Sequence, residues 1–533
     1  MKYQKIVPIG ISLLMVVLHS FLLTPNYDDG FNAYFISNTI DFVNPFFSDY
    51  FNTRFVVLKI PVLIMALGFT YLFPFSFAFP SALYGMLCIL CSFLSYKVAR
   101  LYSNSKTALL CSQLFLYFLL THDWVCPTRF ELWLLSVMLV VIYLFELYNK
   151  NRKSKYLILI SLFVGIFGLP LHSNASILYV FLIGYLVFNR NIFSIKELGI
   201  FLISLAITSI VGMAIVVFPD PVESIGFLKR MSMESGNRFI PNIINLSRYL
   251  FFINTYYLRY LLGFFVLFTG MWVIENWKEF YQSIPYYIRL HKNIFIFFIS
   301  VFIAIEILPA GSWNIYFTYY FFPICFLMSK LFFLKISSKG RYIVLLILML
   351  ALIRFVVVHI NLSDLMKPLT LFKLLLFYVP IITIVYFNKI KLNLLYVLIF
   401  FGLGLKIFYQ YHNWQVYNEV REIYESHIDQ PIIASAEFNW IDRSNTNYGF
   451  APFLRNSNPS DLNSGLVIFG ETQASRAYPV STFLDSCSDC NFDLIGEISS
   501  SFNVFVGNKF MGLKVYRYSG FNVINSPFNN KTD

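Results

Sequence analysis

Residues 6–35 read "IVPIGISLLMVVLHSFLLTPNYDDGFNAYF", and this stretch decides how the chain must fold. Residues 6–24 form a nearly unbroken apolar run, long enough to cross the lipid hydrocarbon as a helix. Asp28 and Asp29 follow where the chain leaves that run. No small-residue cleavage site follows Thr24, and more apolar runs come later, so we interpret residues 6–24 as a retained membrane helix and not as a signal peptide.

The rest of the chain repeats this pattern. Of its 533 residues, 58% are hydrophobic and only 13% are charged, against about 25% charged in a typical soluble domain. The sequence therefore predicts an all-α polytopic membrane protein of about thirteen crossings. They are expected at residues 6–24, 80–96, 107–121, 131–148, 156–170, 174–188, 198–218, 259–274, 293–309, 315–333, 342–359, 371–387 and 393–409.

The net charge of +12 reflects orientation in the membrane, not binding to nucleic acid. With the N-terminus in the cytoplasm, 20 of the 40 basic residues fall in the N-terminus and the short loops on that side, as the positive-inside rule requires. A crossing at 59–79 would invert every later loop, so we expect 61–73 to lie in the outer interface. The predicted site is the bacterial inner membrane, with the C-terminal tail in the periplasm.

The composition changes near Tyr411. We expect a transmembrane module over 1–410, with a first outer loop at 25–79, and a small periplasmic α/β domain over 411–533. The second part begins with a helix, "WQVYNEVREIYESH", and continues with short strands such as "PIIASA", "GLVIFG", "NVFVG" and "LKVYRY". In that oxidising compartment Cys487 and Cys490 of "CSDC" are expected to form a local disulfide, and a redox or metal site is the weaker alternative.

Charged and polar side chains collect in the predicted outer loops. Together they would line one water-facing cavity at the outer membrane surface. The candidates are Asp28, Asp29, Arg54, Lys59, Arg129, Glu131, His172 and Arg238.

Each candidate also has a purely structural interpretation. Arg54 and Lys59 would serve equally as anchors to lipid headgroups. Arg129 and Glu131 stand close enough in sequence to form an ion pair at the end of a crossing. His172 would satisfy a loop carbonyl. The functional interpretation rests on the concentration of acids, bases and cations at one end of the bundle.

This arrangement resembles the GT-C fold glycosyltransferases, integral membrane enzymes that take sugar from a polyprenyl-phosphate carrier at the periplasmic or lumenal face. In that family a paired acid opens the first outer loop on a short interfacial helix, and Asp28-Asp29 in "YDDGFNAYFISN" is similar. Lys59 in "LKIPVLIMALGF" resembles the family's basic-Pro stretch. The segment "PTRFE" resembles its Arg-Pro-Glu motif with Phe130 in place of proline, and His172 in "LPLHSNAS" matches a family histidine.

The resemblance implies an inverting transfer of a sugar, a hexose, from a polyprenyl-phosphate carrier to a surface glycan such as O-antigen. The partners would be the lipid-linked donor, the glycan acceptor and the bilayer. No cofactor is required, although a pair of acids is also suited to a divalent cation such as Mg²⁺ or Mn²⁺. Because Phe130 departs from the motif, the roles of Arg129 and Glu131 do not follow from it.

The chemistry of the transfer needs these residue types. A sugar hydroxyl is a poor nucleophile at neutral pH, so a carboxylate, Asp28 or Asp29, is the expected base. Asp28 could instead act only as an N-cap of the following helix. The leaving lipid phosphate needs cations to absorb its developing charge. The cations available for this are Lys59, Arg54, Arg129 and Arg238.

Two other classes of membrane protein have similar hydropathy. A flippase or transporter places charges in the middle of the membrane and often has repeated halves, whereas the central thirds of these crossings are almost free of charge. An O-antigen polymerase or ligase lacks, as a rule, the paired acid after the first crossing and the terminal domain.

Overall fold

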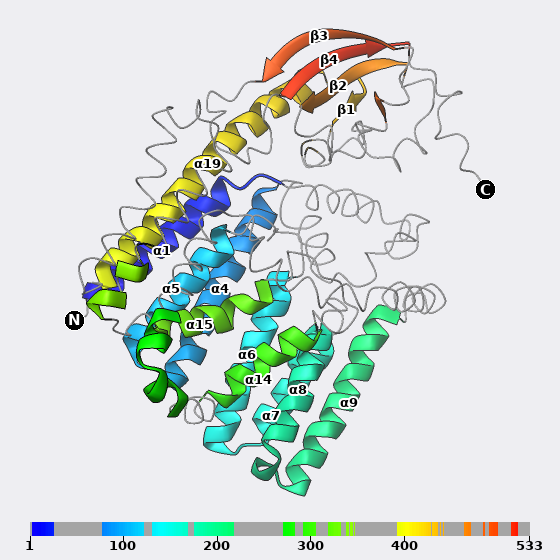
Figure 1. Ribbon diagram of the computed structural model, residues 1–533. Helices are drawn as coiled ribbons and strands as arrows, with labels where there is room; N and C mark the ends of the chain where they lie inside the picture. The colour runs from blue at the N-terminus through cyan, green and yellow to red at the C-terminus, as the bar shows by residue number, and fades with distance from the viewer. Residues whose placement is uncertain are drawn as a thin grey trace. The chain divides into compact units, whose positions relative to one another are not determined.

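The computed structural model (Figure 1) describes the chain in separate stretches. They are residues 3–25, 77–121, 131–168, 175–217, 270–282, 291–304, 318–331, 337–340, 342–344, 346, 392–427, 429–434, 438, 441, 463–470, 483–484, 490–498 and 513–520. Contacts divide the chain into two compact units. The first contains Met1–Val16, Leu87–Val125 and Glu131–Gly404, and the second contains Val17–Met86, Cys126–Phe130 and Leu405–Asp533.

The described structure is mainly helical, as the apolar runs predict. The helices labelled in Figure 1 are α1 (Tyr3–Phe21), α4 (Ala78–Tyr102), α5 (Ser105–Thr121), α6 (Glu131–Asn151), α7 (Lys155–Leu162), α8 (Ser176–Phe188), α9 (Ile195–Val217), α14 (Lys292–Phe302), α15 (Phe321–Leu331) and α19 (Leu392–Ser426). A π-helix, η2 (Phe163–Gly168), continues α7, and a 3-10 turn, η4 (Arg190–Ile192), precedes α9.

Among the described residues, three helices are long and apolar enough to cross a membrane: Ala78–Tyr102, Glu131–Asn151 and Ile195–Ala214. Five shorter apolar helices accompany them. The count of thirteen crossings stays a prediction, because the run at 371–387 and most of those at 259–274 and 342–359 lie outside the described residues. The described helices are therefore compatible with a membrane protein. The number of them that could cross a membrane is smaller than the number of crossings that the sequence predicts.

The three long helices differ in how much of their surface the protein covers. In the most apolar 18 residues of each, 72% are buried in α6, 50% in α4 and only 11% in α9. Large side chains such as Ile203, Ile207 and Ile210 are exposed on α9. Since exposed aliphatic residues on this scale are unfavourable in water, α9 presents the surface that lipid would cover.

Short polar signals set where two helices begin. The Asn104 side chain accepts a hydrogen bond from the Thr107 backbone nitrogen at 2.9 Å, which caps α5. Ser194 and Glu197 form a reciprocal capping box at α9: the Ser194 nitrogen donates to Glu197 at 3.0 Å, and the Glu197 nitrogen donates to the Ser194 hydroxyl at 3.2 Å.

The basic loops of the first unit meet at one end of its helices. Cations in or beside these loops donate to main-chain carbonyls at the ends of other helices, where the helix dipole favours positive charge. The Lys330 ammonium donates to the Tyr102 carbonyl at 3.0 Å, the Arg152 guanidinium donates to the Ile192 carbonyl at 2.7 Å, and Lys292 donates to the Phe188 carbonyl.

The boundary near Tyr411 falls inside a helix. The sequence suggests a crossing at 393–409 and then a separate helix, but α19 runs without a break from Leu392 to Ser426. No proline or glycine stands between residues 405 and 426 to stop it. The apolar run and the amphipathic segment are therefore one helix.

The C-terminal part contains a four-stranded sheet of order β1-β2-β4-β3, visible in Figure 1. The strands are β1 (Ile432–Ile433), β2 (Ser464–Gly470), β3 (Asn491–Ile498) and β4 (Leu513–Ser519). β1 runs parallel to β2, and β4 pairs antiparallel with both β2 and β3. Strands at 432–433, 464–470 and 513–519 match expected ones, and "NVFVG" lies outside the described residues.

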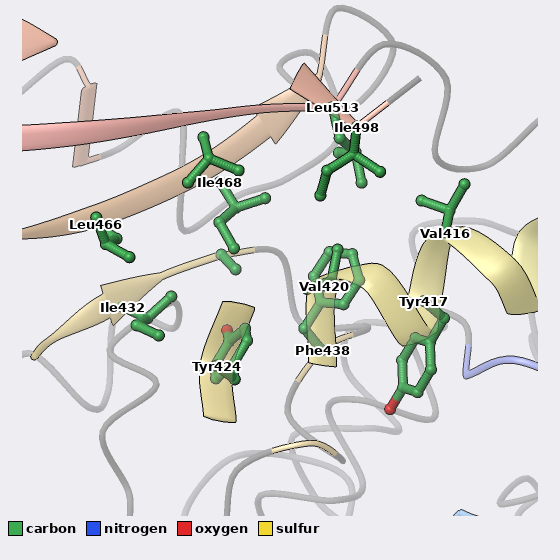
Figure 2. Packing of buried hydrophobic residues seen from close by; sticks show 12 residues of the cluster. Val416, Tyr417, Val420, Tyr424, Ile432, Phe438, Leu466, Ile468, Ile498 and Leu513 are labelled. Carbon is green, nitrogen blue, oxygen red and sulfur yellow. The ribbon is translucent and has the colours of Figure 1, made fainter. Parts of the chain in front are cut away.

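One face of this sheet packs on the end of α19 (Figure 2). Val416 and Val420 of α19 meet Leu466 and Ile468 of β2 and Val515 of β4 in one buried cluster. Alternate strand residues point to one face, and residues four apart on a helix share a side, so the sequence periods of both elements produce this core.

Cys490, the residue that precedes β3, is disulfide-bonded, and its partner lies outside the described residues. The sequence predicts Cys487 as that partner. Cys88, Cys91, Cys111 and Cys325, by contrast, are buried thiols within the helices, as expected for cysteines that serve in packing.

Candidate functional site

The paired acid follows the end of α1. That helix ends at Phe21, and the chain continues through Leu22 to Pro25, the last described residue before the acids. Asp28 and Asp29 themselves lie outside the described residues. Because Asp28 stands three residues after Pro25, covalent geometry keeps their Cα atoms within about 11 Å of each other.

Of the eight predicted site residues, Glu131 alone belongs to the described part of the chain. The others, which lie outside it, are Asp28, Asp29, Arg54, Lys59, Arg129, His172 and Arg238. Glu131 opens α6 with its side chain buried, at 1% exposure. A carboxylate in a first helical turn is favoured by the helix dipole.

Glu131 lies far from the basic loops. Fifteen residues separate it from Glu146 on the same helix, which corresponds to about 22 Å along the axis. Glu146 is close to the basic end, since the Tyr102 hydroxyl and the Asn293 amide both donate to its carboxylate. Glu131 therefore belongs to the end of α6 to which the predicted outer loops attach.

A buried polar cluster at the end of α1 lies outside the set of predicted site residues. The Gln410 Nε2 and His19 Nε2 atoms are 3.0 Å apart, and the His19 ring stacks on Tyr84 with centroids 5.9 Å apart. Asn413 stands one turn further along α19. His19, Gln410 and Asn413 are 2%, 5% and 3% exposed.

The hydrogen bond between His19 and Gln410 uses the amide nitrogen of Gln410, which can only donate, so the Nε2 atom of His19 accepts it. Among the residues that the structure describes, the amide oxygens of Gln410 and Asn413 have no hydrogen-bond partner. Two buried acceptor oxygens thus lie on one side of α19, three residues apart.

Aromatic rings border this cluster. Phe21 of α1 lies 6.3 Å from Trp414, and Trp414 stacks on Tyr411 at 6.2 Å. The contacts of His19 with Gln410 and of Phe21 with Trp414 show that α1 and α19 run parallel here. Aromatic residues of this kind are typical of the membrane–water interface.

A second polar cluster lies at the opposite end of α6, around Glu146. Beyond its two donors, Asn189 donates to Asn293 at 3.2 Å, and the Tyr185 hydroxyl donates to Asn149 at 2.7 Å. These side chains come from α4, α6, α8 and α14 and satisfy one another. Such a network of mutually hydrogen-bonded side chains stabilises the packing of these helices against one another.

His291, just before α14, lies against this second cluster. Its ring is 5.8 Å from that of Tyr102 and 5.2 Å from that of Phe326. Burial, together with the nearby Lys330 ammonium, lowers the pKa of His291 to about 4. The ring is therefore neutral at physiological pH.

The sequence does carry a signal for the first cluster. His19 is the only ionisable residue in the run 6–24, and an ionisable residue inside a crossing is a functional candidate by default. Its meeting with Gln410 joins residues 391 positions apart, which no local pattern reveals. Within the described residues, no group of three acidic, histidine or cysteine side chains is placed to hold a metal ion.

Comparison with known proteins adds no family to these observations. No protein-family model matches the chain, and no curated protein matches it.

Proposed function

We propose that the chain is an inverting membrane glycosyltransferase that moves a hexose from a polyprenyl-phosphate carrier to a surface glycan such as O-antigen at the periplasmic face. The observation that carries the proposal is the position of Asp28-Asp29, three residues after the last described residue beyond α1. An acid there stands close to the membrane surface, where a lipid-linked donor presents its anomeric carbon.

Three further observations support the proposal. The helices are apolar and, on α9, exposed as lipid-facing surfaces are. A buried carboxylate, Glu131, opens α6 at the end away from the basic loops. Cys490 is disulfide-bonded, which is typical of an oxidising compartment such as the periplasm.

The proposed step is a direct displacement. The acceptor hydroxyl oxygen attacks the anomeric carbon while its proton passes to Asp28. The bond between that carbon and the phosphate oxygen breaks, and polyprenyl phosphate leaves with the bonding electrons. Lys59, Arg54, Arg129 and Arg238 are the cations available to stabilise the leaving phosphate. A single displacement inverts the anomeric configuration.

The test is transfer by the purified protein in proteoliposomes. Polyprenyl-phosphate hexoses and an O-antigen oligosaccharide are supplied, and glycosylated product and released polyprenyl phosphate are measured by mass spectrometry. Equal amounts of both products support the proposal. Movement of the lipid-linked sugar between leaflets with no new glycosidic bond would identify a flippase instead.

A further inference from the structure

The polar cluster formed by His19, Tyr84, Gln410 and Asn413 is unusual because its polar side chains are buried among apolar helices. Three of these side chains come from apolar runs or their ends, and all four are buried. Burying a polar group without a hydrogen bond costs about 1–3 kcal/mol. Such a group persists in a fold when it has a task that an apolar residue cannot perform.

Within the described part of the chain, two acceptor oxygens of the cluster have no hydrogen-bond partner. Gln410 donates to His19 through its nitrogen, which leaves its oxygen as an unpartnered acceptor, and the oxygen of Asn413 is also without a partner. Both residues are at least 95% buried. These two buried oxygens therefore retain unused capacity to accept hydrogen bonds.

We infer that the His19–Gln410–Asn413 cluster is a recognition site for the hydroxyl groups of a sugar. The inference rests on the proposed function and names a part of its substrate site. Amide oxygens are neutral acceptors, so they suit hydroxyl donors and offer no hydrogen bond to a phosphate anion. Two of them also fall short of the roughly six to eight oxygen ligands that a cation such as Ca²⁺ takes.

The place of the cluster fits a sugar held beside the paired acid. His19 is two residues from the end of α1, and Asp28 follows nine residues after it. The neighbouring rings of Phe21, Tyr411 and Trp414 supply the apolar and amphipathic surface that a lipid-linked molecule meets at the interface. Hydroxyls of either the donor sugar or the acceptor glycan have the required chemistry.

Asn413→Leu tests the inference. The change keeps the branched shape of the side chain and removes a buried acceptor that has no partner among the described residues. Because leucine is larger than asparagine, the unfolding free energy of the variant is measured beside its binding. Binding is measured in nanodiscs to bare polyprenyl phosphate, to polyprenyl-phosphate glucose, galactose and mannose, and to an O-antigen oligosaccharide. Ser12→Ala combined with Gln113→Leu is the control, because these two buried side chains satisfy each other.

Loss of about one hydrogen bond should reduce affinity about tenfold. If Asn413→Leu loses only its preference for sugar-bearing lipid over bare lipid, the cluster binds the donor sugar. A loss confined to the oligosaccharide assigns it to the acceptor. Unchanged affinities in Asn413→Leu, with the wild type binding normally, would overturn the inference and leave the proposed function standing. Wild-type protein that binds neither the lipids nor the oligosaccharide would overturn the proposed function itself.

Discussion

Lys59 lies in an apolar interfacial stretch of the sequence, where a cation can either contact the donor phosphate or anchor the chain to lipid headgroups. If it contacts the donor phosphate, Lys59→Ala should raise the apparent KM for the lipid donor about tenfold or more, because a charge-assisted hydrogen bond is lost. Lys59→Arg should recover part of the loss, since the charge stays and the geometry changes. Donor kinetics are measured at saturating acceptor, and unchanged kinetics in Lys59→Ala would make the residue a headgroup anchor.

His291 gives the protein a specific response to acid. Its pKa is about 4 in the folded chain and about 6.5 in an unfolded one. The unfolded state therefore binds a proton more readily, and this group lowers stability as the pH falls from about 6.5 towards 4. The protein should therefore be less stable at pH 5 than at pH 7.5.

The measurement is the apparent unfolding free energy of the purified protein at pH 7.5 and pH 5. His291→Phe keeps an aromatic ring beside Phe326 and should flatten the difference between the two values. His427→Phe at the end of α19 serves as the control variant. Equal acid sensitivity in wild type and His291→Phe would show that His291 does not titrate as described.

At the scale of elements, the packing of η2 on α9 depends on one glycine. A Cβ on Gly165 would collide with the backbone of Thr208 and Ser209, and the Thr208 hydroxyl donates to the Ser161 carbonyl at 2.7 Å. Small residues allow membrane helices this close approach. Gly165→Ala should therefore cost about 1–3 kcal/mol, measured by thermal unfolding in detergent.

Gly199 on α9 is the matched control. A Cβ there would meet nothing within 4 Å, so Gly199→Ala should be neutral or gain up to about 1 kcal/mol of helix propensity. A stable Gly165→Ala protein would contradict the close contact between η2 and α9.

The sequence predicts the elements better than it predicts their contacts. Apolar runs locate α4, α5, α6 and α9 within a few residues, because hydropathy and helix length are local properties. The strand at 491–498 was not singled out, since most of its side chains are exposed and give no clear alternation. The sequence does not predict that α19 is continuous, because the change in composition near Tyr411 resembles the end of a helix.

The candidate site shows the same division. Asp28 and Asp29 are predicted from a local motif and stay a prediction, whereas the contact of His19 with Gln410 depends on the packing of α1 against α19. Glu131 was predicted as a site residue, and its burial could not be read from neighbours such as Phe130 and Leu132. Both the contact of His19 with Gln410 and the burial of Glu131 depend on packing between residues that are far apart in the sequence.

For the whole molecule, a periplasmic transfer site requires the C-terminal sheet to lie outside the cytoplasm. The count of basic residues and the disulfide at Cys490 both support this. An alkaline phosphatase fused after Asp533 should be active in cells, and a green fluorescent protein exported there should be dark. The reverse result would invert the orientation and remove the outer site from the periplasm.

The most direct test of the central claim is the turnover of Asp28→Asn in the proteoliposome transfer assay. Asparagine caps a helix as well as aspartate does, so the substitution preserves a structural role and removes the base. If Asp28 is the base, kcat should fall by about 10²–10⁴-fold while the protein stays inserted and folded, and the same change at Asp29 shows which acid is the base. Near-normal turnover in both variants would contradict the assignment of the paired acid as the catalytic centre.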